Sequence, residues 1–95
     1  MITNKLLLKL KKRNIDNITK TREALLSMQG RIAFLHNLKV ELDMRHGASS
    51  YDIVQIAQFA SMGDFDASLA HPVHVAVAKY IAGELESAAA VCYES

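Results

Sequence analysis

The sequence has few of the residues that break helices or cross-link chains. It contains one cysteine, Cys92, one proline, Pro72, four glycines and no tryptophan among 95 residues. A single cysteine excludes an internal disulfide framework, which fits a reducing compartment. Every apolar run falls short of the ~20 residues that span a bilayer, and the early leucines lack the flanks of a signal peptide. We therefore expect one domain, located in the cytoplasm and not in a membrane.

Sequence motifs for catalysis and for cofactor binding are also missing. Neither a glycine-rich phosphate loop nor a GxSxG nucleophile turn occurs. His71 and His74 lie close together, but a metal site needs three or four converging ligands. We expect these histidines to lie at the surface or to cap a helix. The sequence thus predicts no metal, no cofactor and no enzyme activity.

The charges divide the chain into a basic and an acidic half. Residues 1–46 hold ten Lys/Arg and four Asp/Glu, whereas residues 47–95 hold one lysine and six Asp/Glu. Such asymmetry suggests that the basic half meets an acidic partner, for which DNA is one possibility. The alternative is that the two halves attract each other, either within a helical bundle or in a homodimer.

The spacing of apolar residues predicts an all-α fold. We expect a short basic amphipathic helix at residues 4–13 and one long helix at residues 17–46 with heptad spacing. Two shorter helices, at residues 51–62 and 73–91, would pack against the long helix, and Pro72 suits the start of the last one. Residues 64–72 would form a loop. The predicted organisation is a basic, leucine-rich arm at residues 1–14 and a helical domain at residues 15–95.

The N-terminal arm is the predicted partner-binding site. Its leucines cover more than half of the circumference of the expected helix, and its cations lie toward the end of that helix. Clustered apolar side chains fringed by cations suit a groove on another protein. The opposite interpretation, that the leucines belong to the core of the chain, stays open. The predicted binding residues are Leu6, Leu7, Leu8, Lys9, Leu10, Lys11, Lys12 and Arg13.

A second candidate feature is the turn between the two halves. We expect Gly47 to end the long helix in a left-handed conformation. Ser49, followed three residues later by Asp52, matches a variant of the box that caps a helix N-terminus. The turn motif consists of Arg45, His46, Gly47, Ala48 and Ser49.

This turn, with a leucine-bearing helix before it and two helices after it, resembles the anti-RecBCD proteins of lambdoid phages. These include Gam of lambda, and the small helical Abc accessory proteins of phage P22 are of similar size. The resemblance implies a phage-encoded protein in the host cytoplasm that binds the host RecBCD helicase–nuclease. Such a protein would inhibit or modulate RecBCD, protect phage DNA and alter recombination. One departure is that this chain has a basic N-terminal arm, which would mimic DNA poorly.

Two other functions stay open at the level of sequence. The first is a helical DNA-associated regulator that uses the basic half. The second is a secretion-type chaperone or assembly subunit, for which the long helix would provide the binding surface.

Overall fold

The chain forms a four-stranded sheet with three helices and not an all-α bundle. A computed structural model describes all residues, 1–95. The elements run β1 (Ile2–Leu10), α1 (Ile15–Leu26), β2 (Asn37–Leu42), β3 (Ile53–Phe59), α2 (Met62–Leu69), α3 (Pro72–Ala82) and β4 (Leu85–Glu94). The strand order is β2-β3-β1-β4, and every neighbouring pair is antiparallel. The predicted all-α class is therefore wrong, and the fold is α+β.

Residues 2–10, expected to be mostly helical, form the central strand β1. The strand pairs with β3 on one side and β4 on the other. Leu8 and Leu10 face the helices, whereas Leu7 points to the opposite face of the sheet. Because both faces of this strand carry leucine, the run LLLKL is continuously apolar. Such a run cannot be distinguished from a helix by its periodicity.

The predicted long helix is instead a shorter helix, a turn region and a strand. Helix α1 ends at Leu26, and Gly30 adopts a left-handed φ of 79° in the connection to β2. Ile18 and Leu25 are buried as the heptad predicts, but Val40, which extends the predicted apolar stripe, is buried through the alternation of strand β2. The predicted heptad therefore ran across two elements that the structure separates, helix α1 and strand β2.

The remaining two predicted helices also contain strands. Strand β3 lies within residues 51–62, and the predicted helix at 73–91 divides into α3 and β4. Helix α3 begins at Pro72, as predicted. The expected loop at 64–72 mostly belongs to α2, where Ser61 Oγ accepts a hydrogen bond from the Asp64 N–H at 3.1 Å. None of the helices is long and apolar enough to cross a bilayer.

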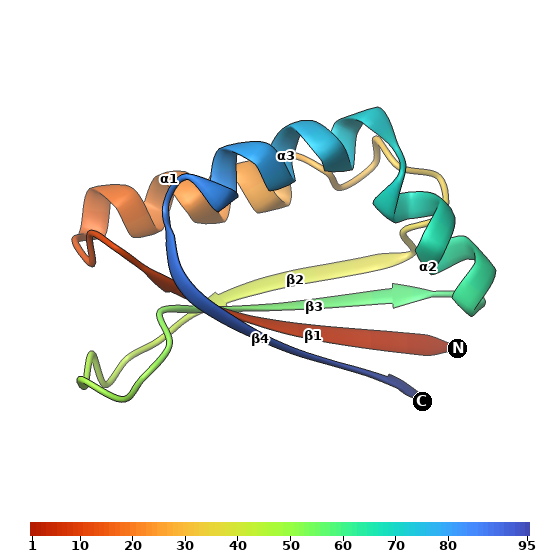
Figure 1. The fold of residues 1–95 in the computed structure, drawn as a ribbon. Helices are drawn as coiled ribbons and strands as arrows, with labels where there is room; N and C mark the ends of the chain where they lie inside the picture. The colour runs from red at the N-terminus through yellow and green to blue at the C-terminus, as the bar shows by residue number, and fades with distance from the viewer.

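All three helices lie on one side of the sheet, which leaves the other side uncovered (Figure 1). The two chain termini lie at the same end of the sheet, because β1 and β4 are antiparallel neighbours. The core fills the space between the sheet and the helices. Its buried apolar residues are Leu8, Leu10, Ile18, Leu25, Met28, Ile32, Leu38, Val40, Ile53, Ala57, Phe59 and Ile81.

Candidate functional site

An apolar cavity lies between the sheet and the helices. It has a volume of about 210 Å³ and is lined by ten hydrophobic residues among fourteen. A second hollow of about 180 Å³ shares part of this lining and continues toward α3. Leu6, Met28, Gln55 and His74 belong to both linings. A concave apolar space with few polar groups is the usual form of a small-molecule site.

The space exists partly because the helix-facing side of β4 carries small residues. Ala88 lies opposite Leu8 and Ala90 lies opposite Leu6, so these alanines point toward the helices with their partners on β1. Ala90 lines the first hollow and Ala88 lines the second, and both alanines are exposed. Their methyl groups leave room where larger side chains would meet α2 or α3. The cavity therefore opens along β4.

Gln55 is a buried polar residue of this cavity. It lies on β3 opposite Leu6 of β1 and Val40 of β2, and only 8% of its surface is exposed. Its Oε1 atom is buried and accepts no hydrogen bond. A buried acceptor without a partner is unfavourable, because it has given up its hydrogen bond to water.

His74 brings a second polar group to the cavity from α3. Its Nδ1 lies 3.1 Å from the carbonyl oxygen of Leu69. A carbonyl only accepts hydrogen bonds, so this contact requires the proton on Nδ1. In the neutral ring, Nε2 then carries a lone pair. His71, in contrast, caps α3 by accepting a hydrogen bond from the Val73 N–H at 3.1 Å, in agreement with its predicted capping role.

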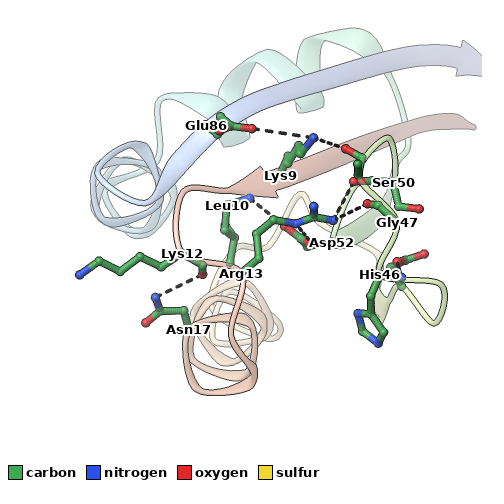
Figure 2. A network of polar contacts seen from close by, with 12 residues as sticks. Lys9, Leu10, Lys12, Arg13, Asn17, His46, Gly47, Ser50, Asp52 and Glu86 are labelled. Atoms are coloured by element: carbon green, nitrogen blue, oxygen red, sulfur yellow. Dashed lines mark hydrogen bonds and ion pairs between the residues drawn. The ribbon is translucent and has the colours of Figure 1, made fainter.

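Arg13 forms an ion pair away from the cavity. Its Nε lies 2.9 Å from Oδ1 of Asp52, whose side chain is only 1% exposed (Figure 2). The other carboxylate oxygen accepts a hydrogen bond from the Leu10 N–H at 2.9 Å. Arg13 Nη2 also donates to the carbonyl oxygens of Gly47 and Ser50. Asp52 therefore anchors the β2–β3 connection, and it does not form the predicted helix-capping box.

The other predicted binding cations, Lys9, Lys11 and Lys12, lie close to Arg13 in the sequence. Lys9 Nζ donates to the Ala48 carbonyl oxygen at 2.6 Å and lies 3.8 Å from the Glu86 carboxylate (Figure 2). Lys11 and Lys12 are exposed. Lys9 and Arg13 thus bind the chain's own β2–β3 connection, and the role of the four cations in binding a partner stays a prediction.

The four predicted binding leucines lie on two faces of β1. Leu8 and Leu10 are each 1% exposed, and Leu6 is half-buried and packs against the core. Leu7 points away from the helices, opposite Val54 of β3 and Ala89 of β4. The structure therefore separates Leu7 from the other three. Of the four, Leu7 is the residue available to a second molecule on the uncovered face.

The predicted turn motif, Arg45–Ser49, lies in the connection between β2 and β3, not between two helices. The left-handed residue is His46, with a φ of 54°, and not Gly47 as expected. The His46 N–H donates to Asp43 Oδ2 at 2.6 Å. This hydrogen bond is the main reason that the pKa of the Asp43 carboxyl lies below its usual value.

The uncovered side of the sheet, called the open face below, carries a second apolar surface. Its apolar residues are Leu7, Val54, Ile56, Ala89, Val91 and Tyr93. Val91 is 55% exposed and Tyr93 is 40% exposed. Lys5 lies on the same face, with its Nζ 5.7 Å from the centre of the Tyr93 ring. Exposed apolar surface of this kind is typical of a protein interface.

Neither Gln55 nor His74 was predicted as a site residue from the sequence. In the segment IVQIAQF, Ile53, Gln55, Ala57 and Phe59 alternate toward the core. This period of two was a signal for a strand, and Gln55 was the polar exception on its apolar side. His74 gave no comparable signal, because its place over the sheet depends on the fold. Nowhere in the structure do three histidine, cysteine or acidic side chains converge as metal ligands would.

These features define a class: a small α+β protein with an antiparallel sheet, an apolar cavity under its helices and an open sheet face. The model of the Dabb family, the stress responsive A/B barrel domain, matches residues 2–95. The chain therefore belongs to the Dabb family. No curated protein sequence matches the chain significantly.

Solved structures with the same fold include proteins described as dimeric. A dimeric ferredoxin-like protein of unknown function from Bacteroides fragilis is 26% identical, with a TM-score of 0.85 over 99% of this chain and 95% of that one. A similar dimeric protein from Thermobifida fusca is 25% identical, with a TM-score of 0.87 over 99% and 90%. A hydroxynitrile lyase from Passiflora edulis is 15% identical, with a TM-score of 0.84 over 97% and 90%, which shows a shared fold alone.

The family match overturns the resemblance to phage anti-RecBCD proteins. The matched sequence motif, Arg45–Ser49, is a connection between strands, and five turn-forming residues recur in unrelated folds. The predictions that the chain inhibits or modulates RecBCD and protects phage DNA are therefore wrong, and the comparisons give no support to a phage origin. The comparisons also give no support to DNA as a partner. The long helix required for a secretion-type chaperone is not formed.

Proposed function

We propose that this protein binds a small, mostly apolar molecule in the cavity between its sheet and its helices, and that two copies assemble through their open faces. The observation that carries the binding proposal is the buried, unpaired Oε1 of Gln55 inside an otherwise apolar space. A core built only for stability would place an apolar side chain there, because an unpaired buried acceptor weakens the fold.

Cavity size supports a ligand of one or two rings. A cavity of about 150 Å³ in another protein holds benzene. The hollow next to Gln55 measures about 210 Å³ and continues into the second hollow. Neither lining contains an aspartate, glutamate, lysine or arginine, so a charged molecule would lose its hydration without gaining an ion pair.

The binding proposal is tested with 2-methoxynaphthalene, a neutral two-ring ether, by isothermal titration. The wild-type chain is expected to bind it at one site per chain. Ala90→Leu fills the opening along β4 and is expected to weaken binding about tenfold or more, since it removes space without adding a polar group. Ala76→Leu adds the same atoms at an exposed position of α3 outside both linings and serves as the control. Equal binding by Ala90→Leu and the control, or no binding by the wild type, would overturn the proposal.

Assembly through the open face is supported by its exposed apolar residues and by relatives described as dimeric. Strand β4 adds to this argument. It is an edge strand of ten residues, none of them buried, with the apolar run AAAV. Ala89, Val91 and Tyr93 of this strand belong to the open face. A second copy, packed sheet to sheet, would cover the open face beside this strand.

Proton transfer is a second candidate activity, favoured by His74. Its Nδ1 is held by the Leu69 carbonyl, which leaves Nε2 of the neutral ring free to accept a proton from a bound molecule. The sequence-based expectation of no enzyme activity stays a prediction beside this candidate. The hydroxynitrile lyase of the same fold shows that the fold can support an enzyme in another protein.

The test is deuterium exchange of 2-tetralone, a two-ring ketone, followed by proton NMR in D2O. Nε2 of His74 would remove a proton from the carbon next to the carbonyl, and the resulting enolate would take a deuteron from solvent. Wild-type protein should accelerate the exchange and His74→Gln should lose the acceleration. Equal rates for the two proteins would exclude His74 as the base.

A further inference from the structure

Gln55 is an exception among the buried polar side chains of this protein. Thr21 donates to the Asn17 carbonyl oxygen, Ser68 donates to the Phe65 carbonyl oxygen, and Asp52 is paired with Arg13. Oε1 of Gln55 is the one buried side-chain nitrogen or oxygen that has no partner. The fold therefore satisfies its buried polar groups everywhere except at the cavity.

The surroundings of this oxygen restrict what could pair with it. On the sheet, Gln55 lies between Leu6 and Val40, neither of which can donate a hydrogen bond. The Ser68 hydroxyl also lines the cavity, but it already donates its hydrogen bond to the Phe65 carbonyl oxygen. Asn4, whose amide also lines the cavity, does not donate to Oε1 either. A molecule in the cavity that carries an O–H or N–H group would supply the missing partner.

We infer that the cavity selects a neutral ring compound with an O–H or N–H donor, represented below by a hydroxyl, and that Oε1 of Gln55 accepts the hydrogen bond from this donor. The inference rests on the proposed binding function and adds the chemical class of the ligand. The rings fill the apolar part of the lining, and the hydroxyl satisfies the one orphaned acceptor. Gln55 is thus the residue that determines specificity.

The experiment compares three two-ring probes of similar size by isothermal titration. 2-Naphthol carries a hydroxyl donor, 2-methoxynaphthalene carries no donor, and 2-naphthoate is an anion. The wild-type chain is expected to bind 2-naphthol about tenfold more tightly than the ether, as one well-placed neutral hydrogen bond would give. It is expected to bind the naphthoate more weakly than the ether.

The matched variant is Gln55→Leu, which keeps the shape of the residue and removes its amide. The readout is the ratio of the affinities for 2-naphthol and the ether within each protein, and the preference for 2-naphthol should disappear in this variant. Its melting temperature should not fall, because the variant removes an unpaired buried group. This stability measurement separates a lost hydrogen bond from a misfolded chain.

The possible results distinguish a failure of the inference about Gln55 from a failure of the proposed binding function. If the wild type binds the ether and 2-naphthol equally, the inference about Gln55 is wrong while the cavity remains a binding site. The inference is also wrong if Gln55→Leu keeps the preference, or if the naphthoate binds most tightly. Failure of all three probes to bind would instead remove the proposed function.

Discussion

At the scale of single residues, the polar groups in the interior of this protein fall into two kinds. Asp52 is fully satisfied by Arg13 and by the Leu10 N–H, whereas Gln55 Oε1 has no partner. The first arrangement holds the β2–β3 connection against the end of β1, as Figure 2 shows. In the proposed function, the second arrangement leaves an acceptor for a ligand. Burial of a polar group would thus stabilise the structure at Asp52 and serve binding at Gln55.

Removal of the Arg13 side chain should destabilise the fold strongly. Arg13→Ala leaves the buried Asp52 carboxylate with one hydrogen-bond donor, so we expect the free energy of unfolding to fall by roughly 3 kcal/mol. Urea denaturation measures this change. Lys12→Ala, which removes a neighbouring exposed cation, should change stability by less than about 0.5 kcal/mol. Similar losses in the two variants would contradict the role given to the ion pair.

Replacement of His46 by glycine should stabilise the chain. The left-handed conformation of His46 costs roughly 1 kcal/mol for a residue with a Cβ, and glycine avoids that cost while losing some backbone entropy on folding. We expect a net gain of about 0.5 kcal/mol for His46→Gly in thermal unfolding. Arg45→Gly, at a neighbouring position without a positive φ, should lower stability. A loss in His46→Gly would show that its side chain contributes more than its backbone strain costs.

At the scale of the elements, the side chains on the two faces of β1 pack in different surroundings. Leu8 belongs to the core, whereas Leu7 lies among the apolar residues of the open face. One strand therefore serves the fold with one row of side chains and the proposed assembly with the other. Whether the early leucines belong to the core therefore has a different answer for Leu8 than for Leu7.

This division predicts different costs for two neighbouring truncations. Leu8→Ala leaves a hole in the core and should reduce the free energy of unfolding by about 3 kcal/mol. Leu7→Ala should cost about 1 kcal/mol or less in samples too dilute to assemble, because Leu7 is only half-buried in the single chain. Both values come from urea titration at low protein concentration. Equal costs would mean that the two faces of β1 are not distinct.

The elements also show which parts of the fold could be predicted from the sequence. Pro72 marked the start of α3 because its preference for the first turn of a helix is local. The alternation in NLKVEL and IVQIAQF was local too, but heptad spacing over residues 17–46 concealed the first, and helical spacing over residues 51–62 concealed the second. The run SAAAV favours a helix by intrinsic propensity, and only its pairing with the distant β1 makes it a strand. Gln55 and His74 could not be brought together before that topology was known.

At the scale of the whole molecule, the helices and the sheet produce two separate apolar surfaces. One is the cavity on the helix side, and the other is the open face (Figure 1). A sheet-to-sheet dimer would cover the second and leave the first accessible along β4. The two proposed functions are therefore compatible in one assembly.

The dimer proposal predicts the effect of a charge in the centre of the open face. Leu7→Lys should give a monomer in light scattering at a concentration where the wild type is a dimer, because an ammonium group buried in an apolar interface loses its hydration. Ala76→Lys adds the same charge on the exposed side of α3 and should remain a dimer. A wild-type chain that is monomeric at every concentration, or a dimeric Leu7→Lys variant, would contradict the proposed interface.

The central claim is that the space under the helices is a binding site, and an NMR titration of the labelled wild-type protein with 2-methoxynaphthalene tests it most directly. Binding there should give saturable shifts of side-chain signals at the cavity, with those of Gln55, His74 and Ala90 among them, and unchanged methyl signals of Leu7, Val54 and Val91 on the open face. Shifts confined to the open face, or no saturable shift at all, would contradict the account.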